Sequence, residues 1–359
     1  MKFNLNNVQL ANICIMQQME YFMQRCFNLA LLGKGKTSPN PIVGAVLVYQ
    51  NSIIGEGYHS KYGGPHAEVE ALKSVSKQNL DKIPHSTLFV SLEPCCYYGN
   101  TPPCTDLIIQ SKISSVVISC LDFNPKIAGK GVQLLKSSGV EVTYGIMEKE
   151  GLELNKMRNK WVKTGIPFIV LKFALSREGF VASIDDQQIW LSGLLAKRFT
   201  HKWRNEMDAI LIGSKTLEID NPYLTARFGF SSNPAVVILA PNTLIKDHYR
   251  IFDSGAKIYI FSNFKPTVQH SSLIYINTSD ITDIIPFVLS SLGEDKVTSL
   301  LVEGGAQVLN TFIDGGYYDE IRVFRSTKSI KHGKRVHLPY TKNFERQQIE
   351  DDQLEIFFN

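Results

Sequence analysis

Four residues in the first third of the sequence have the types and spacing of a catalytic metal site. His66 and Glu68 lie two positions apart in "GGPHAEVEAL", and Cys95 and Cys104 each follow a proline in "EPCCYYGNTPPC". Within a helix, a separation of two turns side chains about 200° away from each other. His66 and Glu68 therefore converge only if His66 lies at the helix entry, where residues 63–65 predict the start.

The prolines also predict that both cysteines lie near the beginnings of helical segments, where unpaired N–H groups and the helix dipole favour the thiolate. One imidazole and two thiolates make a three-ligand Zn²⁺ site with a fourth position for water, whose pKa the metal lowers to about 7. A neighbouring glutamate could accept the water's proton and deliver it to a departing amine. We therefore interpret His66, Cys95 and Cys104 as metal ligands and Glu68 as the catalytic acid–base.

An H-x-E pair alone is common in helices, and it is the combination with "EPC" and "TPPC" that predicts a catalytic metal. Cys96, next to a ligand, is expected to be structural. A redox pair between Cys95 and Cys96 is geometrically poor.

The composition is that of an ordinary globular protein of 359 residues, 44% of them hydrophobic and 20% charged. A net charge of +4 without a Lys/Arg block argues against nucleic acid as a partner. No apolar run approaches the ~20 residues that span a bilayer, and the first residues lack the apolar core of a secretory signal. We therefore expect a cytoplasmic protein with no nucleic-acid or membrane partner, whose six cysteines form no disulfide framework.

Strand and helix patterns alternate along the chain, which predicts sheets covered by helices. The pattern breaks at Gly165 and Pro167, so we predict an N-terminal extension at 1–18 and domains at 19–164 and 165–359. The first domain has predicted helices at 20–32, 66–75, 105–112 and 131–139, a hairpin at 42–48 and 53–57, and strands at 87–92, 115–120 and 140–145. The second has predicted strands at 168–175, 208–213, 235–240, 256–261, 272–277 and 298–305, and helices at 193–205 and 306–316.

The "HAE", "PC" and "C" segments resemble the zinc-dependent deaminases of cytidine and adenosine, although eight residues separate the cysteines here and usually two do there. The longer loop ending in "TPPC" and the segment "SPNPIVGAVLV" resemble the deaminase of riboflavin biosynthesis. This resemblance implies a three-layer α/β/α fold like that of cytidine deaminase, and a contact between Asn40 and the substrate. Tyr97 and Asn100 replace a histidine and a basic residue that help those deaminases to hold their substrate.

Residues 165–359 resemble the reductase that follows the deaminase in bifunctional riboflavin-biosynthesis enzymes, through "LKFALSREG", "WLSG", the run 201–227 and "VEGG". The implied fold is α/β and like that of dihydrofolate reductase, with NADPH as the hydride donor. By resemblance, the substrate would contact Gln188, Arg204, Leu224, Arg227 and Glu303. By the same resemblance, the cofactor site would comprise Ala174, Trp190, Thr216, Asp220, Gly305, Ala306, Gln307, Val308, Leu309, Asn310 and Thr311.

Two features of this domain leave its chemistry open. Ala240-Pro241 occupy positions where relatives have an Asp followed by Ser or Thr, so a preference for NADPH over NADH does not follow. No side chain is an obvious acid or base, which favours catalysis by positioning of hydride donor and acceptor.

The resemblance implies two consecutive reactions. With one zinc ion, the first domain would hydrolytically deaminate 2,5-diamino-6-ribosylamino-4(3H)-pyrimidinone 5′-phosphate. With NADPH, the second would reduce the ribosyl side chain to give 5-amino-6-ribitylaminouracil 5′-phosphate. Relatives associate through the reductase domain, so we expect a homo-oligomer, with "FIDGGYYDEIRVF" as a candidate sheet edge.

Three alternatives remain open at this point. The first is a reductase whose deaminase domain is only a scaffold, impaired by Tyr97 and Asn100. The second is a nucleic-acid deaminase, which would require basic, aromatic strand-binding surfaces that the sequence does not offer. The third is a zinc-stabilised binding module, in which Glu68 would have no use.

Overall fold

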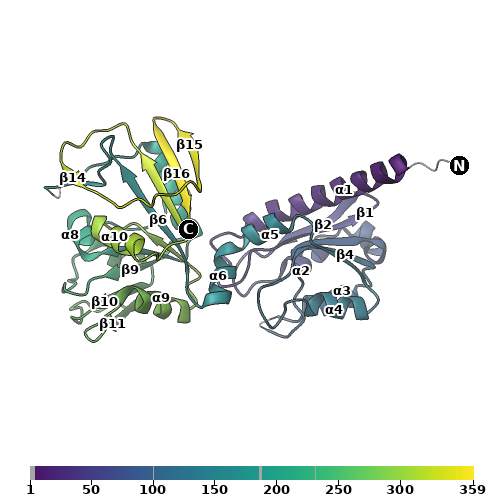
Figure 1. Cartoon of the computed structure of the whole chain (residues 1–359). Coiled ribbons are helices and arrows are strands. Elements are labelled where there is room, and N and C mark those ends of the chain that lie inside the picture. The colour runs from purple at the N-terminus through teal and green to yellow at the C-terminus, as the bar shows by residue number, and fades with distance from the viewer. Residues whose placement is uncertain (1–4, 100, 186–187, 231) are drawn as a thin grey trace. The chain divides into compact units, whose positions relative to one another are not determined.

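The chain forms two compact units, Met1–Lys163 and Thr164–Asn359. The computed structural model describes residues 5–99, 101–185, 188–230 and 232–359, and each unit is an α/β layer structure of its own (Figure 1). The predicted two-domain α/β class is thereby confirmed. Helical structure begins at Leu5, within the predicted extension, so Met19 does not mark the start of the first helix.

The first unit is built on a five-stranded mixed sheet that starts with the predicted hairpin. Gln50 and Asn51 connect its strands with φ of 45° and 65°, the left-handed pair that a tight hairpin turn requires. The strand order is β2-β1-β3-β4-β5. The strands are β1 (Gly44–Tyr49), β2 (Ser52–Tyr58), β3 (Thr87–Leu92), β4 (Ser115–Cys120) and β5 (Glu141–Tyr144).

Alternation of side chains along the strands buries both faces of this sheet. Val46 and Val48 pack under α1 (Leu5–Leu31), whereas Ala45 and Leu47 face the opposite helical layer. A side chain at Gly44 would meet the Cys26 carbonyl oxygen at 2.0 Å, so only glycine lets α1 lie so close. The result is the predicted three-layer arrangement (Figure 1). The other helices of the unit are α2 (Ala67–Lys73), η1 (Lys77–His85), α3 (Cys104–Gln110), α4 (Lys130–Ser137), α5 (Glu148–Leu154) and α6 (Lys156–Thr164).

The second unit contains a nine-stranded sheet in the order β11-β10-β9-β8-β12-β6-β13-β16-β15. Neighbouring strands from β11 to β13 are parallel, and the last two pairings, β13 with β16 and β16 with β15, are antiparallel. They are β6 (Phe168–Leu175), β8 (Ala209–Gly213), β9 (Ala235–Leu239), β10 (Ile258–Ser262), β11 (Leu273–Asn277), β12 (Ser299–Val302), β13 (Glu320–Arg325), β15 (Phe344–Ile349) and β16 (Asp352–Phe358). A two-stranded ladder joins β7 (Ala182–Ser183) to β14 (Gly333–Lys334).

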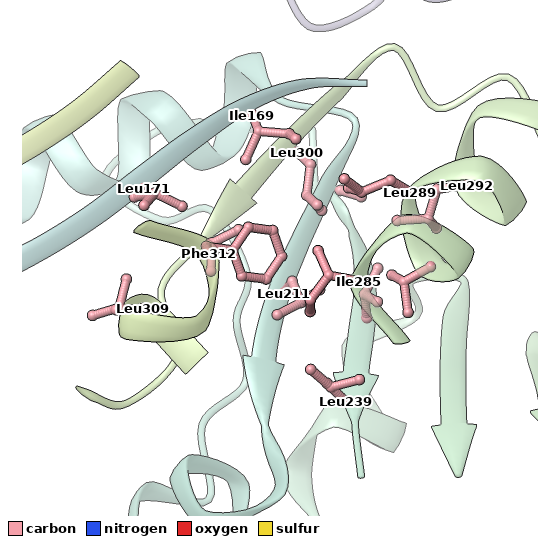
Figure 2. Close-up of a cluster of buried hydrophobic side chains, with 14 of the residues drawn as sticks. Ile169, Leu171, Leu211, Leu239, Ile285, Leu289, Leu292, Leu300, Leu309 and Phe312 are labelled. Carbon is pink, nitrogen blue, oxygen red and sulfur yellow. The ribbon is translucent and has the colours of Figure 1, made fainter. Parts of the chain in front are cut away.

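Helices cover both faces of this large sheet. Phe312 and Leu289 lie among the leucines and isoleucines of one face, contributed by α10 and α9 (Figure 2). On the opposite face, the Trp203 ring of α7 stacks on Phe324 of β13, with centroids 5.5 Å apart. The helices are α7 (Leu194–Glu206), α8 (Ser214–Asp220), η2 (Arg250–Ser254), α9 (Ile284–Glu294) and α10 (Ala306–Asp314).

Ile169→Val is expected to lower the free energy of unfolding of the second unit by about 0.5–1.5 kcal/mol, because one buried methyl group leaves a packed core. Ile169 is 1% exposed and lies in the cluster of Figure 2. Ile184→Val is the matched control, since that side chain is 62% exposed. Urea denaturation followed by circular dichroism measures both. Equal stability of the two variants would contradict the packing described here.

The prediction that "FIDGGYYDEIRVF" supplies a sheet edge is wrong. Its strand, β13, pairs with β6 on one side and with β16 on the other. The chain returns antiparallel after β14 and covers the edge that β13 would otherwise expose. Sequence patterning missed this because β15, "FERQQI", has five exposed positions out of six and reads as polar loop.

Candidate active sites

The first site brings together the three predicted metal ligands. His66 Nδ1 lies 3.2 Å from Cys104 Sγ and 3.5 Å from Cys95 Sγ, and the three ligand atoms all lie within 4.8 Å of one another. Tetrahedral Zn²⁺ with ordinary bond lengths would separate an N from an S ligand by about 3.6 Å. One nitrogen and two sulfurs are also the donor set that zinc prefers, so the residues fit the metal.

The two cysteines are positioned differently. Cys104 begins α3 as predicted, but Cys95 lies in the loop after β3 rather than at a helix start. The reason is the long intervening segment, which leaves no helix beginning at Cys95. Instead, the Cys104 N–H donates to Cys95 Sγ at 3.3 Å, and Thr105 donates from its N–H to the Cys95 carbonyl at 3.1 Å. Hydrogen bonds from the Cys104 thiol and His66 lower the pKa of Cys95 to about 5, so a thiolate forms readily.

A buried carboxylate beside Cys95 holds the surrounding loops. Glu93 is 3% exposed and accepts hydrogen bonds from the backbone N–H groups of Asp122, Gly129 and Val132, at 3.2, 2.9 and 3.1 Å. It thereby caps α4 and ties the loop after β4 to the strand end that precedes Cys95. Sequence analysis missed this role. The signal was an acidic residue directly after a buried strand.

Glu68 lies in the first turn of α2, two residues from the ligand His66, which is the N-cap of this helix. The predicted convergence at the helix entry is therefore what the structure shows. Glu68 is 3% exposed, and its carboxyl group interacts with the Cys104 thiol. Burial raises the pKa of Glu68. The arrangement places a proton-carrying group directly beside the cluster of His66, Cys95 and Cys104.

A second histidine, which the sequence analysis missed, connects Asn40 to this cluster. His59 is 2% exposed, and its Nδ1 lies 2.8 Å from the Pro65 carbonyl, to which it donates. Burial lowers the pKa of His59. Because the Pro65 carbonyl can only accept, the neutral ring carries its proton on Nδ1, and Nε2 is placed to accept from the Asn40 amide at 3.2 Å. The His59 and His66 rings are 5.5 Å apart. It is the NH₂ group of the Asn40 amide that contacts His59.

Two positions in the loop between Cys95 and Cys104 depart from the family pattern, Tyr97 and Asn100. Tyr97 is 38% exposed on this loop. Asn100 lies outside the described residues. Cys96 is half-buried, and its thiol lies 3.9 Å from the Lys126 carbonyl, away from the ligand cluster.

The second site is a cavity of about 1390 Å³ in the second unit. It lies where parallel strands end: Glu303 follows β12, Ser214 follows β8, and Pro241 lies two residues beyond β9. Ligands bind at this edge of open α/β sheets because loops and helix starts converge there. The volume exceeds what a drug-sized ligand needs and suits two molecules side by side.

A buried cluster of charges lines this cavity. Arg204 Nε and Nη2 donate to the two oxygens of Glu303 at 3.0 and 2.7 Å, a bidentate pair. Lys172 also lines the cavity, and burial lowers its pKa although Glu303 opposes this. Lys172 is a candidate acid or base that the sequence analysis did not name. Its signal was a lysine inside the buried strand "FIVLKFAL".

Most residues predicted by resemblance for the second site line this one cavity. Thr216 accepts from the Gly305 N–H at 2.9 Å, and the Gln188 amide donates to Asp220 at 3.2 Å. Lys197 lies 4.3 Å from the centre of the exposed Trp190 ring. Those lining the cavity are Ala174, Gln188, Trp190, Arg204, Thr216, Asp220, Leu224, Arg227, Glu303, Gly305, Ala306, Gln307, Val308 and Thr311.

Two predicted residues do not line the cavity. Leu309 is fully buried in the core under α10. Asn310 donates from its side chain to the Arg335 carbonyl and accepts from the His337 N–H. Helix α10 turns these two positions away from the glycine loop at its start.

These two sites on these two folds define a bifunctional enzyme that joins a zinc-binding deaminase domain to a reductase domain. Residues 16–120 match the cytidine and deoxycytidylate deaminase zinc-binding region, and residues 167–337 match the RibD C-terminal domain. The chain belongs to the riboflavin biosynthesis protein RibD family. It is a deaminase and reductase of riboflavin biosynthesis, and both domains are present, so the reductase-only alternative finds no support.

The relatives match along nearly their whole length. The riboflavin biosynthesis protein RibD of Bacillus amyloliquefaciens is 37% identical over 313 residues, which cover 85% of this chain and 83% of the relative. That of Aquifex aeolicus is 35% identical, covering 88% of each chain. The crystal structure of a diaminohydroxyphosphoribosylaminopyrimidine deaminase/5-amino-6-(5-phosphoribosylamino)uracil reductase from Thermotoga maritima superposes with a TM-score of 0.87 at 35% identity, covering 96% of this chain and 99% of that one. Among the described residues, no helix is long and apolar enough to cross a membrane.

Proposed function

We propose that the first unit deaminates 2,5-diamino-6-ribosylamino-4(3H)-pyrimidinone 5′-phosphate and that the second reduces the ribosyl side chain with NADPH to 5-amino-6-ribitylaminouracil 5′-phosphate. The observation that carries the proposal is the cluster of His66, Cys95 and Cys104 with Glu68 buried against it. The large cavity lined by Arg204 and its partners supports the second reaction. The choice of substrates is supported by the Thermotoga maritima relative, a deaminase and reductase of phosphoribosylamino-pyrimidines.

In the deaminase site, His66 Nδ1 and the two cysteine sulfurs would hold one zinc ion. When bound, zinc acts as a Lewis acid and makes water nucleophilic near neutral pH. Glu68 accepts a proton from the attacking water and delivers it to the amine, so that the amino group leaves as ammonia and the water oxygen stays on the ring carbon. Asn40, oriented by the contact of its NH₂ group with His59, contacts the pyrimidine through its amide oxygen.

In the reductase site, Arg204, Arg227, Gln188, Leu224 and Glu303 bind the phosphoribosyl substrate. When bound, NADPH would supply the hydride for C1′ of the ribosyl side chain, and a proton would go to the ring oxygen as its bond to C1′ breaks. Lys172 is a candidate proton carrier, because it lines the cavity and burial lowers its pKa. The proposed cofactor contacts are Ala174, Trp190, Thr216, Asp220, Gly305, Ala306, Gln307, Val308 and Thr311, and they no longer include Leu309 and Asn310, which do not line the cavity.

We also infer a cytoplasmic enzyme that acts on small phosphorylated pyrimidines, without nucleic-acid or membrane partners. Its residues 1–18 act as an extension to a deaminase domain at 19–164, and 165–359 form the reductase. Association into a homo-oligomer through the reductase domain is retained, but β13 is not its edge. Light scattering that finds a monomer would contradict it.

Cys104→Ala is expected to reduce the zinc content from about one ion per chain to near zero, because two protein ligands hold zinc poorly. Cys96→Ala is the control, since its thiol lies apart from the cluster. Inductively coupled plasma mass spectrometry of both proteins measures the metal. Full zinc content in the Cys104 variant would exclude this residue as a ligand.

The two half-reactions, assayed separately with the full chain, test the function. With the diamino substrate and no NADPH, ammonia release supports the deaminase. With the deaminated substrate, oxidation of NADPH supports the reductase, and the same assay with NADH settles the coenzyme. Zinc binding without ammonia release would favour a scaffold or binding role for the first unit.

A further inference from the structure

His201 on α7 is a buried side chain of the reductase cavity to which neither reaction above assigns a role. It is 5% exposed and lines the cavity together with Arg204 and Arg227. Its ring packs edge-on against Phe228, with centroids 5.1 Å apart. Burial, then Arg204 and Arg227, lower the pKa of His201 to about 4. The ring is therefore neutral near pH 7 and carries one N–H, whose position decides what it can do.

Two backbone groups lie within hydrogen-bond distance of Nδ1 of this ring. The backbone nitrogen of Arg227 and the carbonyl oxygen of Thr225 each lie 3.1 Å from it. One is a donor and the other an acceptor, so a single tautomer satisfies only one of them. Arg204 Nη1 already donates to the Thr225 oxygen at 3.4 Å. This favours the tautomer in which Nδ1 accepts from the Arg227 backbone and the proton lies on Nε2.

In that tautomer two donors lie side by side in the cavity. His201 Nε2 is 3.5 Å from Nη2 of Arg227. Neither can accept from the other, so both are free to bond to one shared acceptor. A phosphate group offers several strong acceptor oxygens and is the anion that arginine forks attract.

We propose that His201 is a direct ligand of the substrate's phosphate, donating from Nε2–H to the anion that Arg227 and Arg204 attract. The inference rests on the proposed reductase function and deepens it by naming a third phosphate ligand. The histidine adds a neutral, directional donor to two charged ones, and its Nδ1 fixes the loop that carries Arg227. A phosphorylated substrate is thereby distinguished from an unphosphorylated one.

A pair of substitutions separates the ligand role from a purely structural one. His201→Gln keeps a donor near the Nε2 position, whereas His201→Asn keeps one only near Nδ1. The readout is competitive inhibition of NADPH-dependent reduction by inorganic phosphate in the full chain. We expect the inhibition constant to rise about tenfold in the Asn variant, as for loss of one hydrogen bond to a charged group, and about threefold or less in the Gln variant. The opposite order, or equal effects, would overturn the inference while leaving the reductase function intact.

A spectroscopic measurement tests the tautomer without activity. In the full chain with inorganic phosphate, ¹⁵N NMR of His201 is expected to show a protonated Nε2 and an unprotonated Nδ1. A protonated Nδ1 would show that the ring donates to the Thr225 carbonyl instead, and it would overturn the proposal. If the unaltered chain oxidises no NADPH with the deaminated substrate, the reductase function itself fails, and the NMR result still decides the tautomer.

Discussion

Glu68→Gln is expected to reduce ammonia release from the diamino substrate by a factor of about 10²–10⁴ while the zinc content stays unchanged. The amide retains the shape of the side chain but cannot take a proton from water and pass it to the amine. Glu68 is buried directly beside the ligand cluster, so bulk water cannot readily replace it. A coupled ammonia assay and metal analysis of the same preparation measure both quantities.

Glu70→Gln provides the matched control for this experiment. Glu70 lies on the same helix, and its carboxylate is part of an exposed ion pair with Lys73. Its replacement is expected to leave ammonia release within about twofold, because exposed pairs contribute little. Undiminished activity of the Glu68 variant would place the proton carrier elsewhere. Loss of zinc would show instead that Glu68 supports the ligands.

Glu303→Ala is expected to lower the free energy of unfolding of the reductase unit by about 3–5 kcal/mol, because it removes one partner of a buried ion pair. Glu303 makes a bidentate pair with Arg204, and both side chains are nearly buried, at 11% and 13% exposed. Removing the carboxylate leaves the positive charges of Arg204 and Lys172 buried without the negative charge of Glu303 beside them. Chemical denaturation of the full chain, followed by reductase-unit fluorescence, measures the loss.

The effect of this substitution depends on pH in a defined direction. Burial alone would raise the pKa of Glu303, but Arg204 and Lys172 outweigh it, and the pKa falls below the ordinary 4.5. A lowered pKa in the folded state stabilises the protein above the unfolded pKa, and this stabilisation is lost as pH falls through the folded value. The gap between wild type and variant is therefore largest near pH 7 and narrows below about pH 4.5. Glu345→Ala, an exposed site on β15, should show no such gap.

The elements that sequence patterning predicted best are those with strong local signals. Strands β3, β4 and β6 have the predicted bounds, because continuous apolar runs end at turn residues. The grouping of His66, Cys95 and Cys104 was predictable because the cysteine and histidine spacing is typical of a metal site. Strands β15 and β16 were missed, since a partly exposed antiparallel hairpin carries little apolar pattern.

The roles that sequence could not predict depend on contacts between distant segments. Glu93 holds the loop after β4 by three backbone N–H groups, and His59 orients Asn40 across 19 residues. His201 is defined by a loop more than 20 residues further along the chain. Such bonds leave no local pattern, because the partners lie far apart along the chain and several of them are backbone groups, which do not depend on the residue type.

The place of β16 in the sheet has a consequence for biosynthesis. This strand comes last along the chain, yet it pairs with β13 on one side and β15 on the other. The first unit emerges completely from the ribosome before the second and can fold while translation continues. The nascent reductase unit, by contrast, exposes the open side of β13 until β16 has been made, and in that interval it is most exposed to mispairing with other chains.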